Sequence, residues 1–341
     1  MKKSPGWTST LATSVRQRCE AVGRLVKKPS IKFALKTAVG FIVLGTVARH
    51  VRLTWVRLHE QGGELRVEPV WVALSLVLYL AGLTIFGLYF DRIMKQSPTP
   101  VRWGAAVRAY LISHLGKYVP GKALVVVMRV GLITPYGARG ATAAFATLYE
   151  TLVMMAAGAL VATLGFLIVP LEWWPVLVGL ALSSALLVVV HPRVFPRILA
   201  LVSVPFKGVG PDALPRFTLR LLAEGLLFAS GGWVLLGLSQ VAVIRAVAAA
   251  GVPPLQWPVV IGSVALATVT GFAVAVLPGG LGVREGVLMA TLQPVIGPET
   301  AVFAALALRL TWLIGELVIA AVLSLVRPSL PAVSLVEVPV P

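Results

Sequence analysis

Charged side chains are scarce in this sequence: Asp, Glu, Lys and Arg together make up 13% of its 341 residues. Soluble domains usually contain about one quarter charged residues. Hydrophobic residues account for 58% of the chain. The composition therefore excludes an ordinary soluble domain and indicates an integral membrane protein.

Cysteine is almost absent, because Cys19 is the single one in the chain. One cysteine excludes an intrachain disulfide and a metal site built from clustered cysteines. The sequence also lacks His-Glu-x-x-His, Gly-x-Ser-x-Gly and Walker patterns, and its apolar segments leave no room for a sizeable soluble catalytic domain. We therefore expect no metal, no cofactor and no enzymatic activity.

Acidic residues are few beside basic ones, which gives a net charge of +17. Such a charge would suit a nucleic-acid partner, but most of the Lys and Arg lie between apolar segments, where they set orientation in a membrane. The segment 1–31 holds seven of them before the first apolar run, whereas the loop 170–173 holds none. We expect no nucleic acid, and an N-terminus on the cytoplasmic side.

Long apolar runs are what the sequence has in abundance. Six of them approach the roughly 20 residues that a membrane-spanning helix needs. They are 32–48, 70–90, 141–169, 174–190, 221–239 and 300–326. Two further apolar regions, 103–133 and 257–297, are interrupted by Pro-Gly sequences. The predicted fold is an all-α polytopic membrane protein with about six full transmembrane helices and two broken, re-entrant helical hairpins.

The two interrupted regions resemble each other. Glu150 follows Pro120 by 30 residues, and Arg309 follows Pro278 by 31, each within the next long apolar run. This correspondence predicts two repeats, at about 32–169 and 174–326. Each repeat has three crossings, so the second would be inverted in the membrane, which is a recurrent plan of transporters. A chance likeness between apolar segments is the alternative. The remaining segment, 327–341, is expected to be a C-terminal tail.

The stretch Val276-Leu-Pro-Gly-Gly-Leu-Gly-Val-Arg-Glu-Gly-Val-Leu288 has the strongest pattern. Pro278 interrupts the helical hydrogen bonds, and Gly279, Gly280 and Gly282 allow the chain to turn and to approach a ligand closely. The half-helix that follows would present free N–H groups beside Arg284, which together suit an anionic head group such as a phosphate. The alternative is a packing bend in which Arg284 pairs internally with Glu285.

Ionisable residues inside the other apolar runs cost about 2.5–3.5 kcal/mol each for Arg, Lys and Asp, so they usually face a cavity or a partner. Here these are Glu150, Glu224, Arg309 and Glu316. We expect Arg309 to line the binding site, and Glu150, Glu285 and Glu316 to balance charge or respond to protons. Neutralisation between neighbouring helices is the alternative.

The first interrupted region supplies a second set of candidates. Pro120 and Gly121 form the expected hinge. Lys122 and Arg129 lie seven residues apart and would form a basic wall of the binding site. The nearby His114 is expected to pack rather than to relay protons.

Three of these features resemble the transmembrane domain family of lysylphosphatidylglycerol synthase, also called flippase-like. They are Gly116-Lys-Tyr-Val-Pro-Gly-Lys122 with Arg129, the Leu-Pro-Gly-Gly-Leu-Gly-Val-Arg-Glu-Gly stretch, and Arg309 in a following span. The resemblance covers about 32–326. It implies a protein of a bacterial or archaeal cytoplasmic membrane, related to the half of a bifunctional enzyme that moves an aminoacylated phospholipid between leaflets.

Two departures limit this resemblance. No segment of the sequence corresponds to the soluble aminoacyl-transfer domain of the bifunctional proteins, and Thr151 follows Glu150 where the family often has Arg. Lysylphosphatidylglycerol is therefore not implied as the substrate. The prediction is a protein that binds an amphiphilic membrane lipid with an anionic head group and moves it between leaflets. The alternatives are a scaffold or accessory subunit for a lipid-modifying glycosyltransferase, and a membrane-embedded lipid-modifying enzyme.

Overall fold

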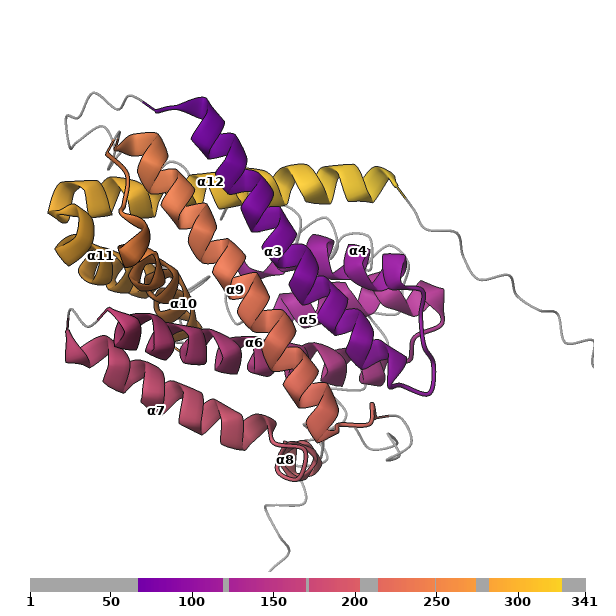
Figure 1. The fold of residues 1–341 in the computed structure, drawn as a ribbon. Coiled ribbons are helices and arrows are strands. Elements are labelled where there is room, and N and C mark those ends of the chain that lie inside the picture. Colours follow the sequence, from indigo (N-terminus) through magenta and orange to yellow (C-terminus); the bar gives the residue numbers. More distant parts are fainter. Residues whose placement is uncertain are drawn as a thin grey trace, which may run out of the picture. The chain divides into compact units, whose positions relative to one another are not determined.

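The computed structural model describes residues 67–118, 123–169, 172–202, 214–248, 250–273 and 282–326. Every regular element in these residues is helical (Figure 1). The helices are α3 (Pro69–Lys95), α4 (Trp103–Ser113), α5 (Ala123–Ile133), α6 (Gly140–Ile168), α7 (Trp173–Val190), α8 (Phe195–Val202), α9 (Leu219–Val247), α10 (Trp257–Ala273), α11 (Val283–Ile296) and α12 (Pro298–Leu325). Short 3₁₀ segments are η1 (His114–Tyr118), η2 (Thr134–Tyr136) and η4 (Pro254–Gln256).

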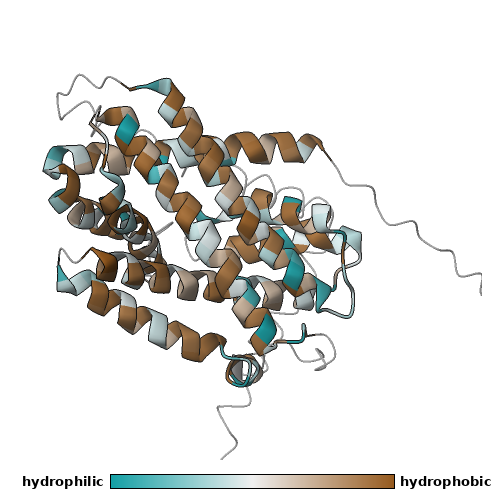
Figure 2. Ribbon diagram, in the orientation of Figure 1, coloured by the Kyte–Doolittle hydropathy of each residue, from teal (hydrophilic) through white to brown (hydrophobic). Residues whose placement is uncertain are grey.

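Six helices in the described residues are long and apolar enough to cross a membrane. Five of them, α3, α6, α7, α9 and α12, coincide with predicted spans, and Figure 2 shows that hydrophobic residues predominate along α7 and α12. The sixth is the 20-residue segment Pro254–Ala273, predicted only as half of a broken hairpin. It is long enough to span because nothing interrupts its helix before residue 273. The protein is thus a multi-pass membrane protein.

Helices α3 and α9 lie side by side and run in opposite directions (Figure 1). Gly82 of α3 lies against Leu236 of α9, whereas Tyr89, further along α3, lies against Gly225, earlier in α9. The small residues let the two backbones approach closely, as is usual between membrane helices. The antiparallel direction is what the predicted inversion requires of two equivalent spans. The repeat itself is not established, since its first span, 32–48, lies outside the described residues.

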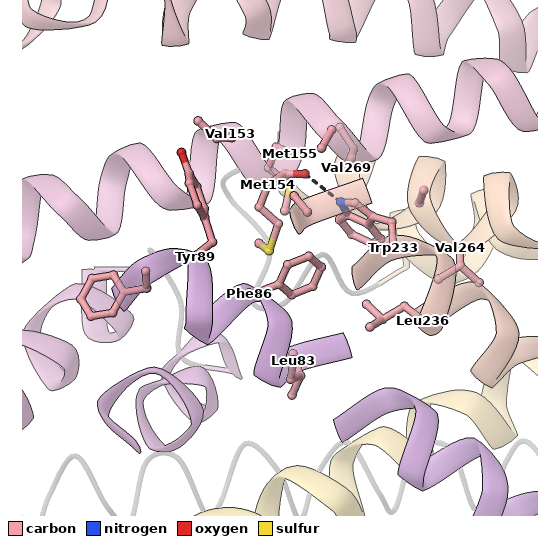
Figure 3. Close-up of a cluster of buried hydrophobic side chains, with 14 of the residues drawn as sticks. Leu83, Phe86, Tyr89, Val153, Met154, Met155, Trp233, Leu236, Val264 and Val269 are labelled. Carbon is pink, nitrogen blue, oxygen red and sulfur yellow. Dashed lines mark hydrogen bonds between the residues drawn. The ribbon is translucent and has the colours of Figure 1, made fainter. Parts of the chain in front are cut away.

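A cluster of large apolar side chains fills the space between α3, α6, α9 and α10 (Figure 3). Trp233 of α9 is buried there, and its indole Nε1–H donates to the carbonyl oxygen of Met154 at 2.8 Å. Gly158 of α6 leaves room for the Trp233 ring, which lies 2.7 Å from where a Cβ would stand. This hydrogen bond satisfies the one polar atom of a large buried ring, so the cluster positions α9 against α6.

Both interrupted regions fold into pairs of helices that contact each other. We call the pair α4 and α5 the first hairpin, and the pair α10 and α11 the second hairpin. In the first pair, a Cβ on Gly116 would lie 2.7 Å from the backbone nitrogen of Val125, so η1 and α5 meet backbone to backbone. The breaks themselves lie outside the described residues. The predicted positions there are Pro120, Gly121, Lys122, Pro278, Gly279 and Gly280, and the segments 1–31 and 327–341 are also outside.

Candidate functional site

A cavity of about 270 Å³ lies where the two hairpins meet α3, α6, α9 and α12. Much of its wall is apolar and is formed by part of the cluster in Figure 3, including Leu83, Phe86, Met155 and Leu236. Charged and polar side chains also line it. They include Tyr79, His114, Lys117, Arg129, Glu150 and Arg284. A concave, mostly apolar site with a few converging polar groups is the usual form of a ligand site.

Arg129 of α5 is neutralised in the cavity wall. Its Nη1 donates to Glu150 Oε2 of α6 at 3.0 Å, and its Nε donates to Ser113 Oγ at 3.0 Å. The guanidinium also lies over the rings of Phe90 and Tyr110, 4.9 and 4.2 Å from their centroids. Arg129 and Glu150 are each 1% exposed. Because removing one partner would leave a buried charge uncompensated, this pair fixes the first hairpin to the next span.

In the second hairpin, Glu285 of α11 forms the ion pair that fixes the hairpin to the next span. Its Oε1 accepts from Nη1 of Arg309 on α12. Its Oε2 accepts from the backbone N–H of Gly282 at 2.7 Å. Gly282 precedes α11 with a φ of 84°, a backbone conformation that glycine adopts readily. Glu285 therefore fills part of the N-terminal anion site that the sequence suggested was open to a ligand.

A third ion pair, between the half-buried Lys117 and the buried Glu316, connects the two halves of the chain. Lys117 of η1 donates to Glu316 Oε1 of α12, and the Tyr79 hydroxyl of α3 donates to the same oxygen. His114 Nε2 lies 3.9 Å from this oxygen, and the His114 ring stacks on Tyr110 with centroids 5.9 Å apart. Lys117 is not among the site residues predicted from sequence, although it lies within the motif that begins at Gly116.

Arg284 of α11 differs from these cations, because no described carboxylate lies within 4.0 Å of it. Its guanidinium lies over the Trp312 ring of α12, 4.6 Å from the centroid. Trp312 stacks in turn on Tyr79, with centroids 4.3 Å apart and planes at 9°. Such stacking holds the planar group through a cation–π contact while leaving the N–H donors at its edge available.

Comparison with known proteins agrees with this architecture. A family model described as the lysylphosphatidylglycerol synthase TM region matches residues 33–322. The chain belongs to this family. A search of curated proteins found no match. The matched segment of this TM-region family member contains all the site residues predicted from its sequence.

Among the described residues, the structure brings most of the predicted site residues together. Arg129, Glu150 and Arg284 line the cavity of this family member. Glu285, Arg309 and Glu316 are buried beside it in ion pairs, as the alternative of neutralisation between helices predicts. Their roles in binding stay predictions. Glu224 lies apart from them near the start of α9, where it pairs with Arg92 and Arg220.

The alternative of an internal Arg284–Glu285 pair does not describe the geometry. Glu285 binds Arg309 instead, and Arg284 lies over Trp312. Within the described residues of this TM-region family member, no group of three or more His, Cys, Asp or Glu side chains is arranged to hold a metal ion. The described wall of the cavity combines charged side chains, an aromatic stack and an apolar surface.

Proposed function

We propose that this protein binds an amphiphilic membrane lipid with an anionic head group in the cavity and moves it between the two leaflets. The observation that carries the proposal is Arg284, a half-buried cation at an apolar cavity with an aromatic ring beneath it and no described carboxylate beside it. A cation within the membrane is costly, so it is expected to face a partner or a polar ligand. An anionic head group would supply that partner.

The cavity also suits the hydrocarbon part of a lipid. Its apolar wall includes Leu148 of α6, whose side chain is 42% exposed. A chain that leaves the cavity at this point would stay among the acyl chains of the bilayer. The head group would lie at Arg284. The sequence also predicts Arg129, Lys122 and Arg309 at the binding site, but Arg129 and Arg309 are already paired with Glu150 and Glu285.

The sequence contains no nucleotide-binding pattern that would supply ATP energy. Movement of the lipid would therefore be downhill or coupled to an ion. We place the protein in a bacterial or archaeal cytoplasmic membrane, as the family resemblance implies. Its N-terminus would lie in the cytoplasm, because seven basic residues precede the first apolar run.

Leaflet-specific lipid labelling in reconstituted vesicles tests the proposal. Vesicles that contain the protein should exchange labelled phosphatidylglycerol between leaflets faster than protein-free vesicles. The Arg284→Ala protein should exchange it no faster than the protein-free vesicles. An exchange rate that the protein does not change would favour the scaffold or accessory subunit. A new lipid product formed by the purified protein would favour the lipid-modifying enzyme.

A further inference from the structure

The charges around the cavity are unequally compensated. Three cations line its described wall, Lys117, Arg129 and Arg284. Lys117 binds Glu316, and Arg129 binds Glu150. Arg284 has an aromatic ring as its neighbour rather than a carboxylate. The described wall therefore presents one positive charge that a ligand would have to neutralise.

The carboxylates near the cavity are all engaged. Both oxygens of Glu285 accept hydrogen bonds, one from Arg309 and one from the backbone of Gly282. Glu150 and Glu316 each have one oxygen without a hydrogen-bond partner, but both atoms are buried with almost no accessible surface. A ligand in the cavity reaches neither of them without a rearrangement. An ammonium group on a lipid head would consequently meet Arg284 and Lys117 and find no open acceptor carboxylate in the described wall.

Arg284 is also held in a defined position. Glu285, the next residue, ties the start of α11 to Arg309, and the Arg284 guanidinium rests on Trp312. His114, Lys117 and Arg284 line the same cavity. A planar guanidinium fixed in this way matches the two free oxygens of a phosphodiester, which it binds through paired hydrogen bonds.

We infer that the cavity selects lipids whose head group carries a single negative charge, as a phosphodiester without an ammonium substituent does. This inference rests on the proposed function and narrows its substrate class. It separates this chain from a carrier of aminoacylated phospholipid, whose head group carries added positive charge. The selectivity arises from Arg284 together with the absence of an accessible carboxylate in the described wall.

The test measures binding of four lipid probes to the purified full chain in uncharged detergent. They are phosphatidylglycerol, phosphatidylethanolamine, lysylphosphatidylglycerol and phosphatidic acid. Phosphatidylglycerol should bind about tenfold or more tightly than phosphatidylethanolamine and lysylphosphatidylglycerol, because the ammonium groups of those two lipids would lie near Arg284 and Lys117 with no open carboxylate to accept them. Phosphatidic acid should bind no more tightly than phosphatidylglycerol.

Two substitutions connect the preference to Arg284. Arg284→Gln should reduce the difference between phosphatidylglycerol and phosphatidylethanolamine to less than about threefold, and Arg284→Glu should reverse the order. Arg245→Ala is the matched control, because Arg245 also lies over an indole ring, that of Trp71 at 5.9 Å, and does not line the cavity. It should leave the preference unchanged. Melting temperatures measured in parallel show that each variant is folded.

The outcomes separate the inference from the proposed function. Equal binding of phosphatidylethanolamine or lysylphosphatidylglycerol would overturn the inference while leaving a lipid-binding protein. Tighter binding of phosphatidic acid than of phosphatidylglycerol would overturn the inference that the cavity selects a head group with a single negative charge. Binding of none of the four probes by the folded protein would overturn both.

Discussion

The helix pairs α4–α5 and α10–α11 are each attached to the following helix by one ion pair, with the signs of the two charges reversed. In the first, the cation Arg129 on α5 pairs with the carboxylate Glu150 on the following helix, α6. In the second, the carboxylate Glu285 on α11 pairs with the cation Arg309 on the following helix, α12. Each hairpin is thus fixed to its next span by one buried ion pair. Arg129, the cation of the first hairpin that lines the cavity, is neutralised by its pair. Arg284, the cation of the second hairpin that lines the cavity, has no described carboxylate within 4.0 Å.

This difference suggests that the two hairpins have different roles, the first in stability and the second in ligand binding. The first hairpin contributes a wall in which Arg129 is paired with Glu150 and covered by two rings. The second hairpin uses Glu285 for structure, which leaves the adjacent Arg284 available. Charges that are already paired should affect stability when removed, whereas the available charge should affect ligand binding. Substitutions in the two hairpins should therefore have different consequences.

The largest loss of stability is expected from Arg129→Ala. It leaves Glu150, which is 1% exposed, without its partner, and breaking a buried pair in this way costs about 3–5 kcal/mol. Denaturation of the purified protein in detergent measures the loss. The double change Arg129→Met with Glu150→Gln should recover much of it, as a double-mutant cycle would show. An unchanged melting temperature for Arg129→Ala would show that the Arg129–Glu150 pair does not stabilise the fold.

Glu285→Gln should cost somewhat less, about 2–3 kcal/mol, because glutamine keeps an acceptor for the Gly282 N–H but loses the charge that balances Arg309. Adding Arg309→Met should restore part of the stability. Lipid binding should weaken as well, since the start of α11 positions Arg284. If Glu285→Gln is as stable as the native protein, the two hairpins are not fixed by equivalent ion pairs.

Gly116→Ala tests the close packing of the first hairpin. The added Cβ would lie 2.7 Å from the backbone nitrogen of Val125, so the backbones would have to separate, at a cost of about 1–3 kcal/mol. Gly104→Ala is the control, because nothing lies within 4 Å of that position. It should change the free energy of unfolding by less than about 1 kcal/mol, toward greater stability. Equal effects of the two changes would argue against this backbone contact.

Five of the spans could be predicted from sequence, because an uninterrupted run of about 20 apolar residues is typical of a membrane-spanning helix. Charged residues inside such runs identified Glu150, which lines the cavity, and Arg309 and Glu316, which are buried beside it. The Pro-Gly regions identified Arg129 and Arg284. The segment Pro254–Ala273 is long enough to cross the membrane completely. Its prediction as half of a hairpin was based on the Pro-Gly sequence that follows it.

The partners of the charges could not be predicted from sequence. Adjacent residues on a helix point in different directions, so Glu285 reaches Arg309, 24 residues away, instead of Arg284. Lys117 meets Glu316 across 199 residues, a contact that depends on how the two halves pack. The same is true of the Trp312 ring beneath Arg284. These tertiary contacts determine which cation remains available.

Phosphatidylglycerol exchange between leaflets, measured for the Arg284→Ala protein alongside its unfolding free energy, tests the central claim most directly. We expect the exchange to fall to the protein-free rate while the stability changes by less than about 1 kcal/mol, because Arg284 is only half-buried and its removal leaves no described carboxylate unpaired. Native exchange in a well-folded Arg284→Ala protein would contradict the account. So would a loss of stability as large as that of Arg129→Ala.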